Sequence, residues 1–357
     1  MKTVIKTMSE ENINIEALKE AGSIIRSGGL VAFPTETVYG LGGNALDKDA
    51  SHKIYAAKGR PSDNPLIVHI AEFGEIDDVA VDISDNARKI MEKFWPGPLT
   101  VVLNKSQKVP YETTGGLDTV AVRMPEHKVA RALIKEAGVP IAAPSANISG
   151  RPSPTVAKHV IEDMSDRIEM IIDGGQVGIG IESTIVDMTG DVPMILRPGY
   201  ITKAMIEEVL GEVKVDKVVL AKSVDEIKGN GYVPKAPGMK YRHYAPKAEL
   251  IMFEGDQEKV EKEINKRAKE DILKGKHVAI ICTDESKESY SPDKCTVKSI
   301  GSRKRQESIA HNLYYLLREF DNTDTDIIYS ESFYDKGLGQ AIMNRLIKAA
   351  AYHIEQV

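Results

Sequence analysis

Polar and cationic side chains collect in the first two hundred residues at positions where short apolar runs end. In the first such segment, an apolar run is followed by Thr35, Glu36 and Thr37 and then by Gly40 and Gly42. Ligands bind at strand ends in α/β sheets, so these hydroxyl and carboxylate groups are candidate contacts. The structural alternative is that Thr35 caps a helix and the glycines form turns.

A second segment places Lys58 and Arg60 at the end of a predicted helix, where Pro61 extends the chain. Such cations can instead compensate the helix dipole. The chain then returns to a strand that carries His69, which is either a core residue or a ligand contact. The segment is therefore a candidate anion site with a structural alternative.

In a third segment, a loop of small residues carries Ser145 and Asn147, whose side chains and neighbouring amides could contact a phosphate. The alternative is an Asx or Ser turn that precedes a helix. We expect Ser153 to cap that helix, over 155–164, and Pro154 to lie in its first turn. The helix N-terminus could also meet an anion.

Two arginines end predicted strands: Arg123 and Arg197. The planar guanidinium group suits two-point recognition of carboxylate or phosphate, although each arginine could instead form a surface ion pair. With Lys58 and Arg60 they predict one anion pocket within an acidic domain, and Ser183 adds a hydroxyl nearby.

Several common nucleotide and metal motifs are missing. Neither a Walker A pattern nor G-x-G-x-x-G occurs, and the eight histidines include no H-E-x-x-H, so a P-loop, a dinucleotide fold or a protein-held metal site is not expected. A basic and aromatic segment at 235–246 could bind a nucleotide by charge and stacking. Alternatively, it packs between domains.

The elements that position these residues alternate between strand and helix, which predicts an α/β protein. An α/β sheet domain is expected over 1–210, an extended connector rich in glycine and proline over 211–247, and a smaller domain over 248–357. In the last domain, strands predicted at 250–253, 278–282, 295–297 and 327–329 alternate with helices at 256–274, 306–320 and 338–354. That order favours a parallel, doubly wound sheet.

Composition limits the function classes. The 357 residues correspond to about two domains. With 47 Lys+Arg against 53 Asp+Glu, the net charge of −6 gives no overall cationic field for nucleic acid. There are only two cysteines, no signal-peptide pattern and no apolar run near the roughly eighteen residues that span a bilayer. We expect a reduced, cytoplasmic protein with no membrane role.

Taken in order, these segments resemble the threonylcarbamoyl-AMP synthases of the YrdC family, in the two-domain form with an additional carboxyl-terminal domain. The resemblance covers essentially the whole chain, and its signature is Lys58-Gly59-Arg60 followed by Ser145-Ala146-Asn147. Further motifs lie, in the expected order, at 34–41, 95–98, 143–147, 182–184, 197–199 and 237–246. The resemblance implies a YrdC-like twisted mixed sheet with helices, then a Rossmann-like parallel α/β domain.

The resemblance also implies an activity. Members combine L-threonine, bicarbonate and ATP into threonylcarbamoyl-AMP and pyrophosphate, a nucleotidyl transfer that begins the synthesis of threonylcarbamoyladenosine in tRNA. Mg²⁺ would be bound through the ATP phosphates, with mostly water ligands. A downstream threonylcarbamoyl transferase complex acting on tRNA is the implied partner, and the connector is implied to fold over the pocket as a lid.

Roles follow for individual residues by the same resemblance. The catalytic signature residues are Lys58, Arg60, Ser145 and Asn147. The implied threonine contacts are Thr35, His69, Arg123, Ala143 and Ser183. The implied ATP contacts are Lys58, Ser62, Thr119, Ser145, Ser153, Arg197 and His243. No general base is assigned, because positioning and electrostatics can carry such a transfer.

Two alternative functions remain at this point. A double-stranded RNA-binding or ribosome-maturation module is one, with weak RNA binding, although the acidic net charge argues against RNA as the main ligand. Carbamoyl-phosphate-dependent transfer is the other. The relatives that perform it carry additional acylphosphatase and zinc-finger regions, for which this chain has neither the length nor the cysteines.

Overall fold

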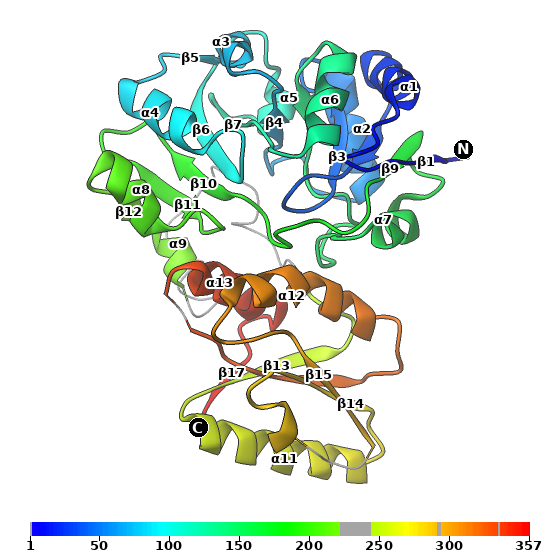
Figure 1. Cartoon of the computed structure of the whole chain (residues 1–357), viewed down its shortest axis with the longest axis vertical. Helices are drawn as coiled ribbons and strands as arrows, with labels where there is room; N and C mark the ends of the chain where they lie inside the picture. Colours follow the sequence, from blue (N-terminus) through cyan, green and yellow to red (C-terminus); the bar gives the residue numbers. More distant parts are fainter. Residues whose placement is uncertain (1, 222–243, 291–293, 335) are drawn as a thin grey trace.

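Two separate β-sheets organise the chain, as the computed structural model in Figure 1 shows. It describes residues 2–221, 244–290, 294–334 and 336–357. The strands of the first sheet are β1 (Val4–Thr7), β2 (Val31–Phe33), β3 (Gly40–Asn44), β4 (Ile67–His69), β5 (Ala80–Val81), β6 (Leu99–Lys105), β7 (Thr119–Arg123), β8 (Ile141–Ala142), β9 (Met170–Asp173), β10 (Thr184–Asp187), β11 (Met194–Arg197) and β12 (Lys214–Val215).

The first sheet is mixed, as expected. Its 12 strands run in the order β1-β9-β2-β3-β8-β4-β7-β6-β10-β11-β12, with β5 beside β6. Strands β4 and β7 pair in parallel, whereas β6 and β7 pair antiparallel. The associated helices are α1 (Ile15–Arg26), α2 (Lys48–Lys58), α3 (Ile76–Val79), α4 (Asp85–Phe94), α5 (Tyr111–Thr114), α6 (Lys128–Ala137), α7 (Ala157–Met164), α8 (Lys203–Leu210) and α9 (Lys217–Leu220).

Helices cover both faces of this sheet because successive strand residues point to opposite sides. On β2, Val31 and Phe33 join one apolar cluster with α1 and α6, while Ala32 joins the cluster on the other face. Helix α1 begins where the Asn14 side chain accepts a hydrogen bond from the amide of Ala17 at 3.0 Å. The sheet is therefore buried on both faces in its centre, and polar side chains gather at its ends.

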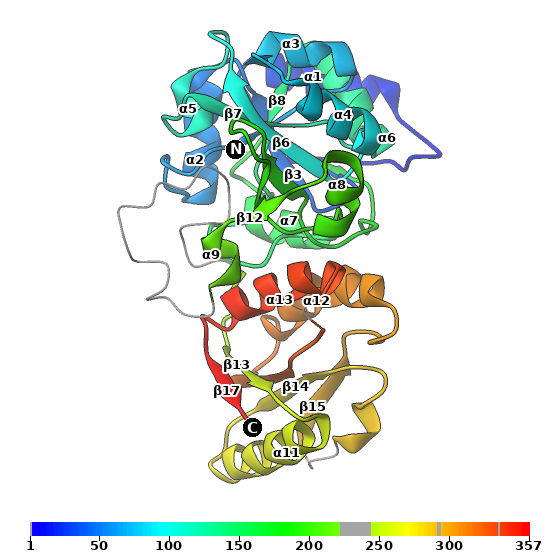
Figure 2. The ribbon, with the colours of Figure 1, turned by 90° about the vertical axis from the view of Figure 1, so that its left-hand side faces the viewer.

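The second sheet is entirely parallel, with the order β15-β14-β16-β13-β17. Helix α11 covers one face, and α12 and α13 cover the face turned toward the first domain (Figure 2). This arrangement is the doubly wound domain that the sequence predicts. The bounds are β13 (Glu249–Glu254), β14 (Val278–Cys282), β15 (Cys295–Ser299), β16 (Ile327–Glu331), β17 (Ile354–Gln356), α11 (Gln257–Leu273), α12 (Gln306–Phe320) and α13 (Leu338–Ala349).

Two local expectations were wrong. Ser153 and Pro154 do not begin a helix, because α7 starts at Ala157 and the Ser153 hydroxyl donates to Glu182 instead. The last helix ends at Ala349 rather than continuing to 354, since Ala351 and Tyr352 adopt positive φ and the chain turns into β17. Strand β3 includes Gly40 and Gly42, so these glycines do not form the turns of the structural alternative.

The segment predicted as a connector, 211–247, begins with regular secondary structure. Strand β12 pairs with β11 and α9 follows it, so the first sheet continues past residue 210. Most of the predicted connector, 222–243, lies outside the described residues. Within the ranges that the structure does describe, no helix has the length and apolar character that a membrane span requires.

Candidate active site

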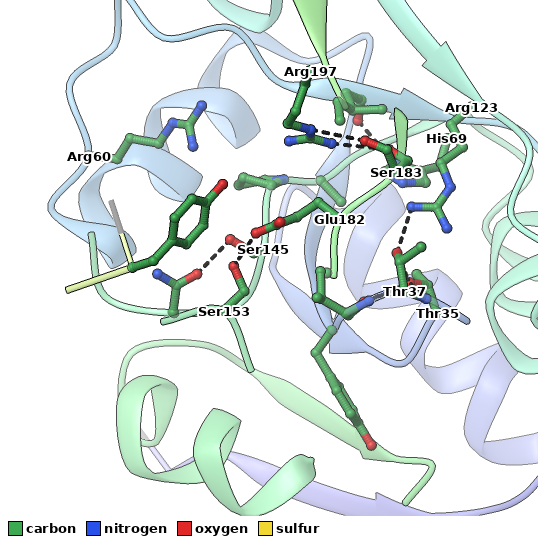
Figure 3. A pocket seen from close by; sticks show the side chains of 18 of the residues that line it. Thr35, Thr37, Arg60, His69, Arg123, Ser145, Ser153, Glu182, Ser183 and Arg197 are labelled. Atoms are coloured by element: carbon green, nitrogen blue, oxygen red, sulfur yellow. Dashed lines mark hydrogen bonds between the residues drawn. The ribbon is translucent and has the colours of Figure 1, made fainter. Parts of the chain in front are cut away.

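A pocket of about 630 Å³, partly open to solvent, lies where several strands of the first sheet end. The register explains the convergence: His69 on β4 pairs with Arg123 on β7, and Ile185 on β10 pairs with Arg197 on β11. A bridge between Gly40 and Ser145 brings the turn after β2 against the loop after β8. Side chains far apart in sequence therefore face one cavity (Figure 3).

One side of the pocket is built around Arg123. Its Nη1 donates to Thr37 Oγ1 at 2.9 Å, and its Nη2 lies 2.6 Å from Glu36 Oε1 in a buried ion pair. The Thr35 hydroxyl donates to the Val38 carbonyl at 2.6 Å. Burial, together with the neighbouring Arg123 charge, lowers the pKa of His69 to about 3, so its imidazole is neutral at physiological pH.

Arg60 and Arg197 line the rest of the pocket wall, and Arg197 lies next to Ser183 (Figure 3). Arg197 donates from Nε to the Ser183 carbonyl at 3.0 Å and from Nη2 to Ser183 Oγ at 3.1 Å. Arg60 donates from Nη2 to two carbonyls, while its buried Nε has no hydrogen-bond partner in the part of the chain that the structure describes. Burial lowers the pKa of Arg60 to about 10, which keeps it cationic at neutral pH. Two guanidinium groups thus remain charged beside the cavity.

Three signature residues hold one another: Lys58 lies behind the pocket wall and bonds to Ser145 and Asn147, which line it. The Lys58 amine donates to the Ser145 carbonyl and, at 2.6 Å, to the Asn147 carbonyl. Ser145 Oγ donates to Asn147 Oδ1 at 2.6 Å, and Asn147 Nδ2 donates to the carbonyls of Ile148 and Arg151. Burial and the nearby Arg60 lower the pKa of Lys58 well below its usual value. This network fixes the shape of the loop.

The structure brings most of the predicted site residues together. Ten of them line the pocket: Thr35, Arg60, His69, Arg123, Ala143, Ser145, Asn147, Ser153, Ser183 and Arg197. Lys58 lies behind the wall, Ser62 is exposed outside it, and Thr119 is at the far end of β7 from Arg123. His243 lies outside the described residues. The roles assigned to these residues stay predictions.

Three charged or polar lining residues, Arg151, Glu182 and Tyr244, were given no site role from the sequence. Glu182 accepts hydrogen bonds from Ser153 at 2.6 Å, from Tyr314 and from Arg345. Burial alone would raise the pKa of Glu182, but the charges of Arg345 and Arg197 lower it to about 2. Its place directly before Ser183, in one of the motifs quoted above, was the available signal.

The comparisons with known proteins agree with this arrangement. Residues 23–199 match the family described as Telomere recombination, and residues 201–351 match the family described as Threonylcarbamoyl-AMP synthase, C-terminal domain. The chain is 50% identical to the threonylcarbamoyl-AMP synthase of Pyrococcus abyssi, over 97% of this chain and 98% of that protein. It is 47% identical to the Bacillus subtilis protein of the same name, over 97% and 96%.

A solved structure extends the likeness to three dimensions. The crystal structure of P. abyssi Sua5 complexed with L-threonine matches with a TM-score of 0.91 and 49% identity, and the match covers 99% of this chain and 100% of that one. The identity, the coverage and the shared fold extend over both sheets. This chain belongs to the threonylcarbamoyl-AMP synthase family.

Proposed function

We propose that this protein is an L-threonylcarbamoyladenylate synthase, a nucleotidyltransferase that converts L-threonine, bicarbonate and ATP into threonylcarbamoyl-AMP and pyrophosphate. The observation that carries the proposal is the convergence of Arg60, Arg123 and Arg197 on one cavity in a chain of this family. The relative crystallised with L-threonine supports an amino-acid substrate. The names of the relatives favour the synthase over the RNA-binding alternative.

The proposed reaction brings two anions together, a carbamate and the triphosphate of ATP. The threonine amine adds to bicarbonate and, with loss of water, gives a carbamate. A carbamate oxygen then attacks the α-phosphorus of ATP while the bond to pyrophosphate breaks. Fixed guanidinium groups screen the repulsion between the two anions and stabilise the charge that develops. Holding the reactants in line contributes further, up to about 7–11 kcal/mol in ideal cases.

The two sides of the pocket suit different substrates. On the side of Arg123, the proposed threonine contacts are the guanidinium group and the side chains of Thr35, His69, Ala143 and Ser183, with Arg123 pairing the amino-acid carboxylate. A neutral imidazole at His69 adds no charge that would compete with that pair.

On the other side, Arg60 and Arg197 are the proposed partners of the ATP phosphates. The unpartnered Nε of Arg60 supports this assignment, because a buried donor needs an acceptor. Ser145 and Ser153 supply hydroxyls beside them. Lys58 and Asn147 are proposed to act mainly by fixing the loop, and contacts of Ser62, Thr119 and His243 with the nucleotide remain part of the proposal.

We propose that Mg²⁺ enters with ATP. In the part of the chain that is described, no three His, Cys, Asp or Glu side chains are grouped as a metal site would require. The Glu182 carboxylate already accepts three hydrogen bonds. This donor set fits an ion that keeps mostly water and phosphate ligands. When bound, Mg²⁺ would neutralise charge on the triphosphate.

The proposed setting is the cytoplasm, where the product would pass to a threonylcarbamoyl transferase complex that acts on tRNA. A pyrophosphate-release assay on the full chain, with ATP and Mg²⁺, tests the function. We expect release to require both L-threonine and bicarbonate, and serine to be a poorer substrate. Salt-sensitive binding of double-stranded RNA with no such release would contradict the proposal and favour the alternative.

A further inference from the structure

Two helices of the second domain send buried polar side chains to the rear of the pocket. Tyr314 comes from α12 and Arg345 from α13, and both are 0% exposed. Figures 1 and 2 show these helices lying between the second sheet and the first domain. Burying a charged guanidinium group between two domains is costly, so its partners are informative; Nε and Nη1 of Arg345 are bonded, and Nη2 has no partner among the described residues.

Arg345 spans two loops of the first domain. Its Nε donates to Glu182 Oε2 at 3.2 Å, and its Nη1 donates to the Pro198 carbonyl at 2.5 Å. The Tyr314 hydroxyl donates to the same Glu182 oxygen at 2.8 Å. The second domain therefore holds one carboxylate and one carbonyl, each from a different loop of the first.

These two contact points flank Arg197, the proposed phosphate contact, and Ser183, the residue to which Arg197 is bonded. Glu182 directly precedes Ser183, and Pro198 directly follows Arg197. The antiparallel pairing of β10 with β11 sets those two loops side by side, and Arg197 donates to both the carbonyl and the hydroxyl of Ser183. By holding Glu182 and Pro198, the Arg345 clamp thus fixes the distance between Ser183 and Arg197.

The clamp also has an electrostatic effect. Glu182 lies in the pocket wall, and its negative charge acts on Arg197. Arg345 and Tyr314 donate to Oε2 and Ser153 donates to Oε1, so both carboxylate oxygens are engaged by groups other than Arg197. Arg345 and Arg197 are the two cations whose charges lower the pKa of Glu182, so loss of Arg345 would leave Glu182 to act more strongly on Arg197. The Arg197 guanidinium group would then turn from the cavity toward the Glu182 carboxylate.

We propose that Arg345 is a positioning residue for the ATP side of this active site. Through Glu182 and Pro198, and with help from Tyr314, it keeps Arg197 aimed into the pocket, so the second domain is a working part of the nucleotide site. This inference rests on the proposed function and adds to it a residue about 200 positions after the Ser145-Ala146-Asn147 signature.

The test uses the full chain with Arg345→Lys and Tyr314→Phe. Lysine keeps the charge but cannot donate to Glu182 and Pro198 in the same two-point geometry. We expect the KM for ATP to rise at least about ten-fold in Arg345→Lys, which loses the two-point contact to both loops, and about three-fold in Tyr314→Phe, which loses one hydrogen bond to Glu182. The KM for L-threonine should change less than the KM for ATP in both.

The matched control is Tyr329→Phe, which also removes a buried tyrosine hydroxyl from the second domain. That hydroxyl donates to Asp271 at 2.6 Å, on the side of α11, away from the pocket. Both KM values should stay within about two-fold of wild type. A shared loss of kcat in all three variants, with unchanged KM values, would mean that the clamp has only a structural role and would overturn the proposal.

A second readout does not depend on activity. In ligand-free protein, amide hydrogen exchange in peptides covering 182–199 should be faster in Arg345→Lys and Tyr314→Phe than in wild type, and unchanged in Tyr329→Phe. If wild-type protein releases no pyrophosphate, the proposed function fails while the exchange result still decides the clamp. If Arg345→Lys does not fold, Tyr314→Phe decides. An unchanged KM for ATP and unchanged exchange in the folded variants overturn the inference.

Discussion

Replacing Lys58 with methionine should disorder the loop that carries Ser145 and Asn147. The Lys58 side chain is 2% exposed, and its amine supplies hydrogen bonds to the carbonyls of both loop residues. Methionine fills similar space but donates none, so two buried carbonyl groups lose their partner. At about 1–3 kcal/mol for each unsatisfied group, the ordered loop becomes less stable by about 2–6 kcal/mol.

The lower end of that range corresponds to a loss of about 30-fold in kcat/KM if the reaction needs the ordered loop. The pyrophosphate-release assay measures this loss, and thermal unfolding of the ligand-free protein measures the stability change. A matched control is Lys53→Met on the same helix, where the amine is bonded only to the Gly28 carbonyl among described residues. The control should retain activity within about two-fold.

The stability measurement separates two roles for Lys58. A loop-fixing role predicts a lower Tm for the ligand-free Lys58→Met variant. A lysine whose only role is to contact ATP predicts an unchanged or higher Tm, because a buried amine is costly to desolvate. Activity within about three-fold of wild type, together with an unchanged Tm, would refute our account of the signature motif.

Further outcomes follow from the same contacts. Arg123→Lys should raise the KM for L-threonine at least about ten-fold while changing the KM for ATP less, since lysine cannot reproduce the contacts to Thr37 and a carboxylate; equal rises in both values would argue against the threonine assignment. Burial lowers the pKa of His159 to about 4, so between about pH 6.5 and 4 only the unfolded chain takes up that proton and stability falls on acidification, by up to about 1.4 kcal/mol per pH unit. His159→Phe should flatten this slope in chemical denaturation, and an unchanged slope would contradict it. Chelation of Mg²⁺ should abolish pyrophosphate release but leave the Tm of nucleotide-free protein unchanged, whereas a lowered Tm would indicate a resident metal.

Much of the fold could be predicted because burial imposes periodicity on local sequence. Helix α12 has the predicted bounds, Gln306–Phe320, and β7 and β11 end at Arg123 and Arg197 as predicted. Strand β3 could not be recognised, since glycine is a weak strand former. Its glycines are needed for close packing: a Cβ on Gly42 would lie 2.7 Å from Ile141 and 2.8 Å from Phe33.

In the site, too, some residues could be predicted from local sequence and others could not. Residues in ordered motifs, such as Arg60 and Ser145, could be located because they follow strand or helix ends. The partner of Ser153 could not, because its hydroxyl is taken by Glu182, 29 residues away, rather than by the next helix. Arg345 carried no local signal at all. Its role depends on how the second domain packs against the first, which no window of sequence contains.

The most direct test is a structure of the full chain with L-threonine and a non-hydrolysable ATP analogue bound together. We predict both molecules in the one pocket, with the threonine carboxylate on Arg123 and the triphosphate on Arg60 and Arg197. A nucleotide bound at any other surface, with the pocket accepting only threonine, would contradict the claim that these arginines bring the two substrates together.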